Sequence, residues 1–233
     1  MANTQVRSYA GQTGAERVQQ RRQALIEAAL DATDLPGGWR NLTVDRLARG
    51  AGLSKRYFYE SFTDLDDLVT ATVDHTFAEL QEAGLSALGV YTDIAELARA
   101  TIAAVVVHLT DDPRRARLIF GEMSASEAVQ HRRSQAMRHI AAVLVAHARI
   151  LHNAGDRTDT IIDTAATFLI GGTGQTIMSW LRGELDCTRE ELVDDLTSLW
   201  LITGNGAAEH AWRRQPATEQ LQPESIPDLP ASD

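Results

Sequence analysis

The sequence contains few of the residues on which several classes of protein depend. Its 233 residues include one cysteine, Cys187, which excludes an intramolecular disulfide framework and a cluster of cysteines around a metal. The N-terminal segment has no apolar stretch typical of a secretory signal, and no apolar run reaches the roughly 18 residues of a membrane span. These absences predict a soluble, cytoplasmic protein with no membrane partner.

Lysine is also nearly absent, because Lys55 is the only one in a chain of formal net charge -10. Up to Phe62 there are nine Lys and Arg residues against six Asp and Glu. From Thr63 onward, 13 arginines face 26 acidic residues. An excess of positive charge confined to the first quarter of an acidic chain favours a local surface that binds a polyanion such as nucleic acid.

Apolar residues recur at three- and four-residue spacing through most of the chain, and the alternation typical of strands is nearly absent. The predicted fold class is therefore all-α. A first helix begins at Glu16 and reaches about Leu35, where Pro36-Gly37-Gly38 ends it. Further helices are predicted at roughly 93–110, 113–122, 124–152, 157–182 and 188–203, with breaks at Asn153–Asp156 and Leu185–Thr188.

Residues 42–62 read LTVDRLARGAGLSKRYFYESF and predict two short helices separated by a turn at Ala51-Gly52-Leu53. The predicted N-caps are Thr43 for the first helix, Ser54 for the second, and Thr63 for the longer helix that follows. Two short helices around a glycine-containing turn form a helix-turn-helix unit, whose second helix enters the major groove of DNA.

The second of these helices separates into an inner and an outer face. Phe58 and Phe62 are predicted to pack inward, which leaves the polar residues toward solvent. Cations, phenols and hydroxyl groups on such a face suit phosphate oxygens and base edges. The predicted DNA-binding residues are Thr43, Arg46, Ser54, Lys55, Arg56, Tyr57 and Tyr59.

With RRQALIEAAL before this unit and TDLDDL after it, residues 17–68 resemble the DNA-binding domain of the TetR (tetracycline-repressor) family of bacterial transcriptional regulators. The resemblance implies an N-terminal helix-turn-helix domain and a C-terminal helical domain for ligand binding and dimerisation. It also implies a homodimer that binds a near-palindromic DNA operator and is released by a small-molecule effector. Leu65 stands where the family usually has a lysine that contacts phosphate, which implies one phosphate contact fewer.

Four segments are predicted along the chain. They are a flexible arm at 1–14, the helix-turn-helix domain at 15–62, the ligand-binding and dimerisation domain at 63–211, and a disordered tail at 212–233. The tail holds four of the six prolines and has no helical periodicity.

The resemblance implies a ligand pocket among the helices of the second domain and a dimer interface formed by its last two helices. Bulky or polar-tipped residues on apolar faces are the predicted ligand contacts, with an ordinary place in the core as the alternative for each: His108, Phe120, Met123, Met137, His139 and Trp180. Apolar residues, and glycines that permit a close approach of the partner backbone, form the predicted interface: Phe168, Gly171, Gly172, Gly174, Leu196 and Trp200.

No catalytic residue, metal ligand or cofactor site is predicted, so we do not expect an enzyme. The stretch GGTGQT at 171–176 lacks the lysine and the preceding strand of a phosphate-binding loop. His131, His139 and His147 are spaced by eight, which places no two of them one helical turn apart for a metal. Two other functions stay open: a helical ligand-binding or interaction protein that has lost DNA binding, and a TetR-like activator.

Overall fold

The computed structural model describes residues 13–34, 38–86, 93–121, 126–151 and 160–214. Helices dominate these residues and none of them forms a strand, which confirms the predicted all-α class. The elements are α1 (Gly14–Asp31), η1 (Ala32–Asp34), η2 (Gly38–Asn41), α2 (Val44–Gly50), α3 (Lys55–Ser61), α4 (Leu65–Leu85), α5 (Ile94–Asp111), α6 (Pro113–Phe120), α7 (Glu127–Leu151), α8 (Thr160–Leu181) and α9 (Arg189–Arg213).

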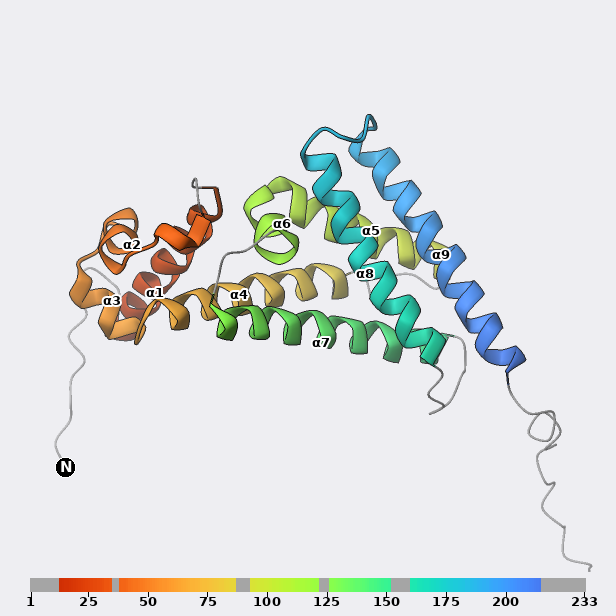
Figure 1. Cartoon of the computed structure of the whole chain (residues 1–233), viewed down its shortest axis with the longest axis horizontal. Helices are drawn as coiled ribbons and strands as arrows, with labels where there is room; N and C mark the ends of the chain where they lie inside the picture. Colours follow the sequence, from red (N-terminus) through yellow and green to blue (C-terminus); the bar gives the residue numbers. More distant parts are fainter. Residues whose placement is uncertain (1–12, 35–37, 87–92, 122–125, 152–159, 215–233) are drawn as a thin grey trace, which may run out of the picture.

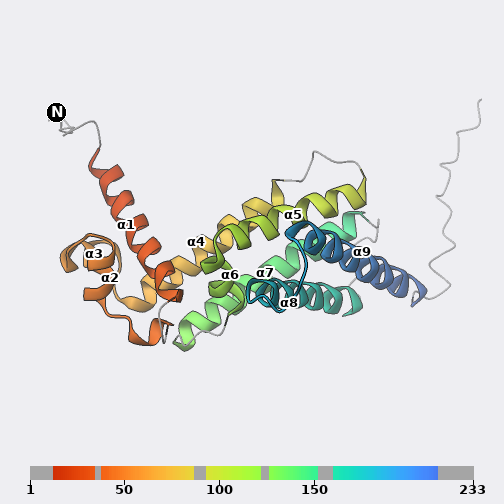
Figure 2. The same cartoon turned by 90° about the horizontal axis from the view of Figure 1, so that it is seen from above.

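The helices form two groups that α4 joins. α1, α2 and α3 lie at one end of the molecule, and α4 runs from them into the larger group of α5 to α9 (Figure 1). Within the larger group α7 lies along α4, and α8 and α9 lie side by side. Seen from above, α2 and α3 stand clear of the larger group, whereas the end of α1 meets it beside α6 (Figure 2). This arrangement leaves α2 and α3 accessible to a large partner.

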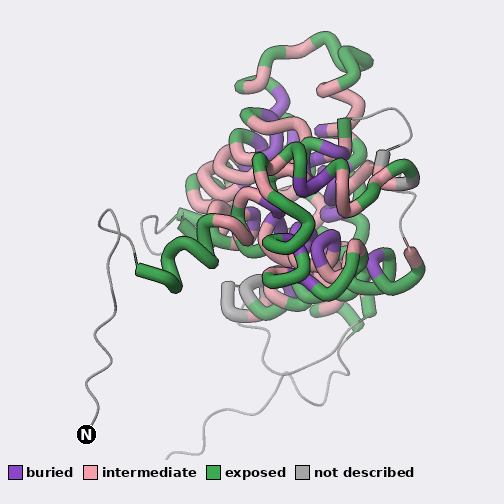
Figure 3. The backbone as a smooth tube through the Cα atoms, turned by 90° about the vertical axis from the view of Figure 1, so that its left-hand side faces the viewer, coloured by how far each residue is buried: buried purple, intermediate pink, exposed green. Residues whose placement is uncertain are grey.

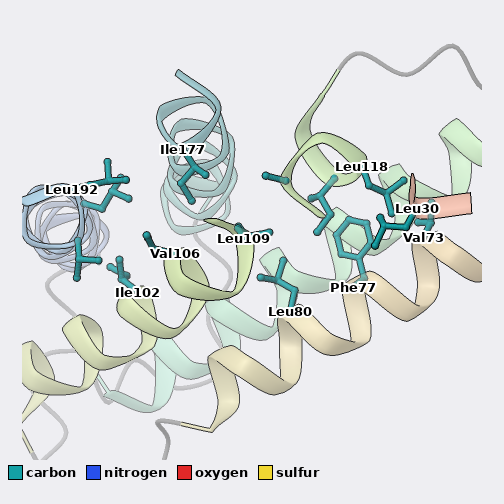
Figure 4. Close-up of a cluster of buried hydrophobic side chains, with 14 of the residues drawn as sticks. Leu30, Val73, Phe77, Leu80, Ile102, Val106, Leu109, Leu118, Ile177 and Leu192 are labelled. Carbon is teal, nitrogen blue, oxygen red and sulfur yellow. The ribbon is translucent and has the colours of Figure 1, made fainter. Parts of the chain in front are cut away.

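Each group has its own apolar core. The smaller core joins α1, α2, α3 and the start of α4; its buried residues are Leu25, Ile26, Ala29, Leu47, Phe58, Phe62 and Leu68. The larger core occupies the centre of the second group, and Leu30 of α1 reaches it beside Leu118 and Val73 (Figure 4). The buried segments lie inside the body and the exposed turns outside it (Figure 3). α1 and α4 therefore belong to both cores, which ties the two groups together.

The helix starts agree only in part with the predicted caps. The Thr43 hydroxyl accepts a hydrogen bond from the backbone N–H of Arg46, as predicted. Ser54 is the N-cap residue of α3, but its side chain makes no capping hydrogen bond. The prediction that Thr63 caps α4 is wrong: Asp64 accepts from the N–H of Asp67, whose carboxylate binds Thr63 instead. An aspartate is as good a cap as threonine and adds the charge that a helix start favours.

Three predicted helix ends are also wrong. α1 ends at Asp31 and continues as the 3-10 turn η1. α6 ends at Phe120, two residues early. α9 runs ten residues beyond the predicted end at 203, through Gly204 and Gly206 to Arg213. Ala207, which is buried, and the alanines near it favour the helix and offset the two glycines. The predicted break at Asn153–Asp156, most of the arm and most of the tail lie outside the described residues.

Candidate functional site

The turn between α2 and α3 depends on one glycine. Gly52 has a φ of 67°, a left-handed conformation that residues with a Cβ rarely adopt. The backbone N–H of Leu53 then donates to the carbonyl of Ala48 at 2.7 Å, which closes the turn and sets the direction of α3. The glycine predicted from the sequence is therefore required by the backbone of this turn.

Two phenylalanines fix the rotation of α3 about its axis. Phe58 is fully buried and Phe62 is 2% exposed, with their ring centroids 6.0 Å apart. Both pack against α1 and α2 in the smaller core. Because the inner face is held in this way, the opposite face of α3 must point to solvent.

All of the predicted DNA-binding residues lie on the exposed side of α2 and α3. Tyr59 is 61% exposed, and its hydroxyl makes no hydrogen bond to another described residue. Tyr57 is 37% exposed because the Arg21 guanidinium of α1 lies over its ring, 4.3 Å from the centroid. All of these side chains are therefore accessible to a partner, and Arg21 covers part of the Tyr57 ring.

Acidic residues neutralise most of the cations of this surface. Asp45 pairs with Arg49 at 2.6 Å and with Lys55 at 3.3 Å. Glu60 pairs with Arg56 at 3.0 Å. Arg46 has no acidic partner among the described residues. Exposed ion pairs contribute only about 0–1 kcal/mol each, so phosphates can displace these carboxylates at little cost.

Leu65 lies at the first position of α4, where its half-buried side chain packs against the smaller core. The residue thus contributes to the interior of the N-terminal group. A leucine side chain cannot contact phosphate as a lysine does.

A large apolar cavity lies in the second group of helices. Its volume is about 720 Å³, and its wall is formed by α4, α5, α7, α8, α9 and the last residue of α6. Ligand pockets commonly measure about 300–1,000 Å³, so the cavity is large enough for an organic molecule.

The predicted ligand contacts fall in different places. Phe120 and Met137 line the cavity. His139 is exposed and lies outside the lining, and Met123 lies outside the described residues. Trp180 also lies outside the lining and donates its indole N–H to the carbonyl of Cys187. The sequence prediction selected bulky residues and therefore missed small residues that line the cavity, such as Gly84 and Ala165.

His108 is packed against α6 and does not line the cavity. Its Nε2 atom is buried without a hydrogen-bond partner among the described residues. Burial, followed by the charge of Arg115, lowers the pKa of His108, against the opposing effect of Glu79 and Asp112. The neutral imidazole is thus the form that suits this position.

The predicted interface residues separate into outer and inner ones. Phe168 is 67% exposed, and Gly171 and Gly172 are also exposed on α8. Leu196, by contrast, is buried in the larger core, and Gly174 is buried against Phe120. The half-buried Trp200 lines the cavity. Packing within one chain therefore explains the positions of Leu196, Gly174 and Trp200.

One cluster that the sequence reasoning missed joins the two groups of helices. Arg114 of α6 pairs with Glu27 and Asp31 of α1 and with Asp112, and Arg117 pairs with Asp34 of η1. The signal was the run DPRRAR at 112–117, whose arginines lie at a helix start that disfavours positive charge. Such a placement indicates acidic partners elsewhere in the fold.

No three His, Cys, Asp or Glu side chains within the described ranges are grouped to hold a metal. Burial and the acidic Glu191, Asp195 and Asp186 raise the pKa of Cys187, which makes its thiol less reactive. No helix in the described part of the chain is long and apolar enough to span a membrane.

No protein-family model matches the chain. A helix-turn-helix-type transcriptional regulator of Mycobacterium tuberculosis is 29% identical over 212 residues, which cover 88% of each protein. A transcriptional regulator from Pseudomonas aeruginosa has a TM-score of 0.68 at 19% identity, covering 82% of this chain and 94% of that one.

A TetR-family regulator from Streptomyces coelicolor matches with a TM-score of 0.63 at 15% identity, covering 87% of this chain and 94% of that chain. The chain has the TetR-family fold. This confirms the resemblance found in residues 17–68. The transcriptional regulator FadR of Bacillus subtilis, whose structure is in complex with stearoyl-CoA, matches with a TM-score of 0.64 at 16% identity. The match covers 76% of this chain and 96% of FadR.

Proposed function

We propose that the chain is a homodimeric transcriptional repressor that binds a near-palindromic DNA operator through α3 and is released by a small molecule in the cavity. The observation that carries the proposal is the exposed part of α3, where Lys55, Arg56 and Tyr59 are exposed while Phe58 is buried. The similarity to a helix-turn-helix regulator along most of both chains supports it.

The surface suits DNA in two ways. Arg46, Lys55 and Arg56 supply positive charge in an acidic chain, and the hydroxyl of Tyr59 is free to bind a phosphate oxygen. In a symmetric dimer the two copies of α3 would occupy successive major grooves about 34–36 Å apart. The preferred duplex would then be an inverted repeat with its half-sites about one helical turn apart.

Dimerisation would use the outer face of α8 and α9. Phe168 of α8 is 67% exposed, and Leu199 and Ile202 of α9 are 54% and 70% exposed. Exposed apolar side chains on two adjacent helices indicate a surface that a partner covers. In sedimentation measurements Ile202→Asp should yield monomers, whereas Val107→Asp, at an exposed apolar residue of α5, should leave the dimer intact. A monomeric unchanged protein would contradict this step.

Release would follow from contacts that the cavity shares with the DNA-binding helices. Phe120 lines the cavity at one end of α6, and Arg114 on the same helix is paired with α1. α4 also runs from the smaller core to the cavity wall. A ligand that favours a different position of α6 or α4 would change the spacing of the two α3 helices and weaken DNA binding.

The test is selection of duplexes from a random pool by the full-length protein. We expect an inverted repeat, with affinity that falls steeply as salt rises. Lys55→Ala combined with Arg56→Ala should reduce the affinity by about 1–3 kcal/mol per side chain while leaving the dimer intact. The matched control, Arg138→Ala with Arg182→Ala, removes two charges from the second group and should have little effect. Failure to enrich any duplex would instead favour a ligand-binding protein without DNA binding.

A further inference from the structure

The cavity wall contains almost no charge. Among the described residues that line it, none is Lys, Arg or His, and the one ionisable residue is Glu209. That carboxylate lies near the C-terminal end of α9 and pairs with Arg213 at 2.5 Å. The described wall therefore offers no unpaired charge to a ligand.

The cavity wall follows long stretches of two helices. Its wall includes α9 from Trp200 to Trp212 and α5 from Ile94 to Val105. At about 1.5 Å of rise per residue, these stretches span about 18 Å and about 16 Å. A cavity of about 720 Å³ whose wall follows two helices over such distances can accommodate an extended molecule.

One buried polar group lies on the wall. Thr173 is 8% exposed, and its hydroxyl oxygen accepts a hydrogen bond from the indole N–H of Trp200 at 2.7 Å. The hydroxyl proton of Thr173 is donated to no other described residue. It can therefore donate to a ligand oxygen, and a buried donor gains by finding an acceptor.

We propose that the cavity binds an uncharged, elongated apolar molecule that carries a hydrogen-bond-accepting oxygen for Thr173 and no carboxylate, phosphate or ammonium group within the cavity. An ionised group buried without a partner costs several kcal/mol. A fatty-acid carboxylate or the phosphates of a coenzyme A thioester would need a cation that the described wall does not supply. The inference rests on the proposed function, because it names the class of effector.

Two tryptophans of the wall make binding measurable without DNA. A bromine atom quenches the fluorescence of Trp200 or Trp212 when it lies in contact with the indole. We therefore propose titrating the full-length protein at pH 8 with three probes of equal chain length: 11-bromoundecanol, 11-bromoundecanoate and (11-bromoundecyl)trimethylammonium. The alcohol should quench to saturation with a Kd at least about tenfold lower than either ion. Equal or tighter binding of an ion, or no saturable quenching by any probe, would overturn the proposal.

A positive charge introduced into the cavity wall should favour binding of the carboxylate probe. Asn205 lines the cavity and is exposed, so Asn205→Arg can be made without burying a cation in the folded core. This variant should bind the carboxylate at least about tenfold more tightly than the unchanged protein does. Ala142→Arg, at an exposed α7 residue outside the lining, is the matched control and should leave all three affinities unchanged. An equal gain in both variants would show non-specific attraction and overturn the assignment.

The role of Thr173 has its own test. Thr173→Val removes the hydroxyl and should weaken the alcohol about threefold to tenfold, the value of one hydrogen bond, whereas Thr173→Ser should retain binding. Equal affinities of the two variants would remove Thr173 from the site.

The two proposals can fail separately, because fluorescence quenching needs no DNA. A failure to select an operator would refute the proposed function and leave the quenching results standing, and the reverse also holds.

Discussion

The proposed DNA-binding surface and the proposed ligand cavity are built in different ways. The predicted DNA contacts all come from residues 43–59, on two short helices and the turn between them. The cavity draws on six helices between Leu80 and Trp212. Local chemistry therefore determines the first site, whereas the packing of distant segments determines the second. The difference predicts that single substitutions at the surface change binding alone, while substitutions at the cavity wall also change stability.

The largest effect on stability is expected just behind the cavity wall, where Gly174 of α8 packs against Phe120. A Cβ added at Gly174 would lie 2.1 Å from the ring of Phe120, so Gly174→Ala forces that ring or α8 to move. We expect the free energy of unfolding to fall by about 1–3 kcal/mol, as for other overpacked cores. Urea denaturation measures this.

The matched control for this prediction is Gly50→Ala, where the added Cβ would lie 3.8 Å from Ala28 in ordinary contact. That variant should be unchanged or more stable by up to about 1 kcal/mol. Equal behaviour of the two alanine variants would show that the contact between Gly174 and Phe120 is not needed.

A smaller effect is expected where the two groups of helices meet. Arg114→Gln removes pairs with Glu27, Asp31 and Asp112 and should lower the free energy of unfolding by about 1–2 kcal/mol at pH 7. Arg182→Gln, which removes an exposed pair with Glu184 within the second group, should leave the free energy of unfolding unchanged within experimental error.

The loss of stability in Arg114→Gln should also depend on pH. Hydrogen bonds from Arg114 lower the pKa of Asp112. A lowered pKa contributes stability that is complete above the unfolded-state value of about 3.9 and is lost as the pH falls through the folded-state value. The difference between the unchanged protein and Arg114→Gln should therefore shrink below pH 4. A difference that stays constant between pH 7 and pH 3 would contradict this role for the ion pair.

The smallest effect is expected at the DNA-binding surface itself. Asp45 neutralises Arg49 and Lys55, so Asp45→Asn should free two cations and tighten DNA binding about threefold. The plot of log affinity against log salt should become steeper by about one, the value for one further phosphate contact. Glu82→Gln makes the same change of charge at the far end of α4 and should have no effect. Weaker binding by Asp45→Asn would show that the carboxylate positions the cations.

Prediction from the sequence was more successful for α2, α3 and the turn between them than for the cavity. The turn at Gly52, the inward Phe58 and the outward Lys55 are set by neighbours within a few residues, and the structure agrees with them. The prediction that Thr63 is the N-cap of α4 was wrong, because the side chain of the neighbouring Asp64 accepts the hydrogen bond at that helix start instead.

Most of the residues that line the cavity could not be predicted, because its space depends on small residues that look unremarkable in sequence. Gly84 and Ala165 line it, while the bulky His139 is exposed. Similarly, Gly174 has the spacing of an interface glycine, yet it accommodates a phenylalanine 54 residues away in the same chain. Such contacts depend on how α6 packs against α8, which no local pattern in either helix reveals.

The most direct test of the coupling between the two regions is one titration read in two ways. The full-length protein, bound to its selected duplex, is titrated with 11-bromoundecanol while tryptophan quenching reports occupancy of the cavity and DNA anisotropy reports release. The two midpoints should coincide, since binding at either site changes the same equilibrium. Quenching that saturates while the duplex stays fully bound would contradict the account.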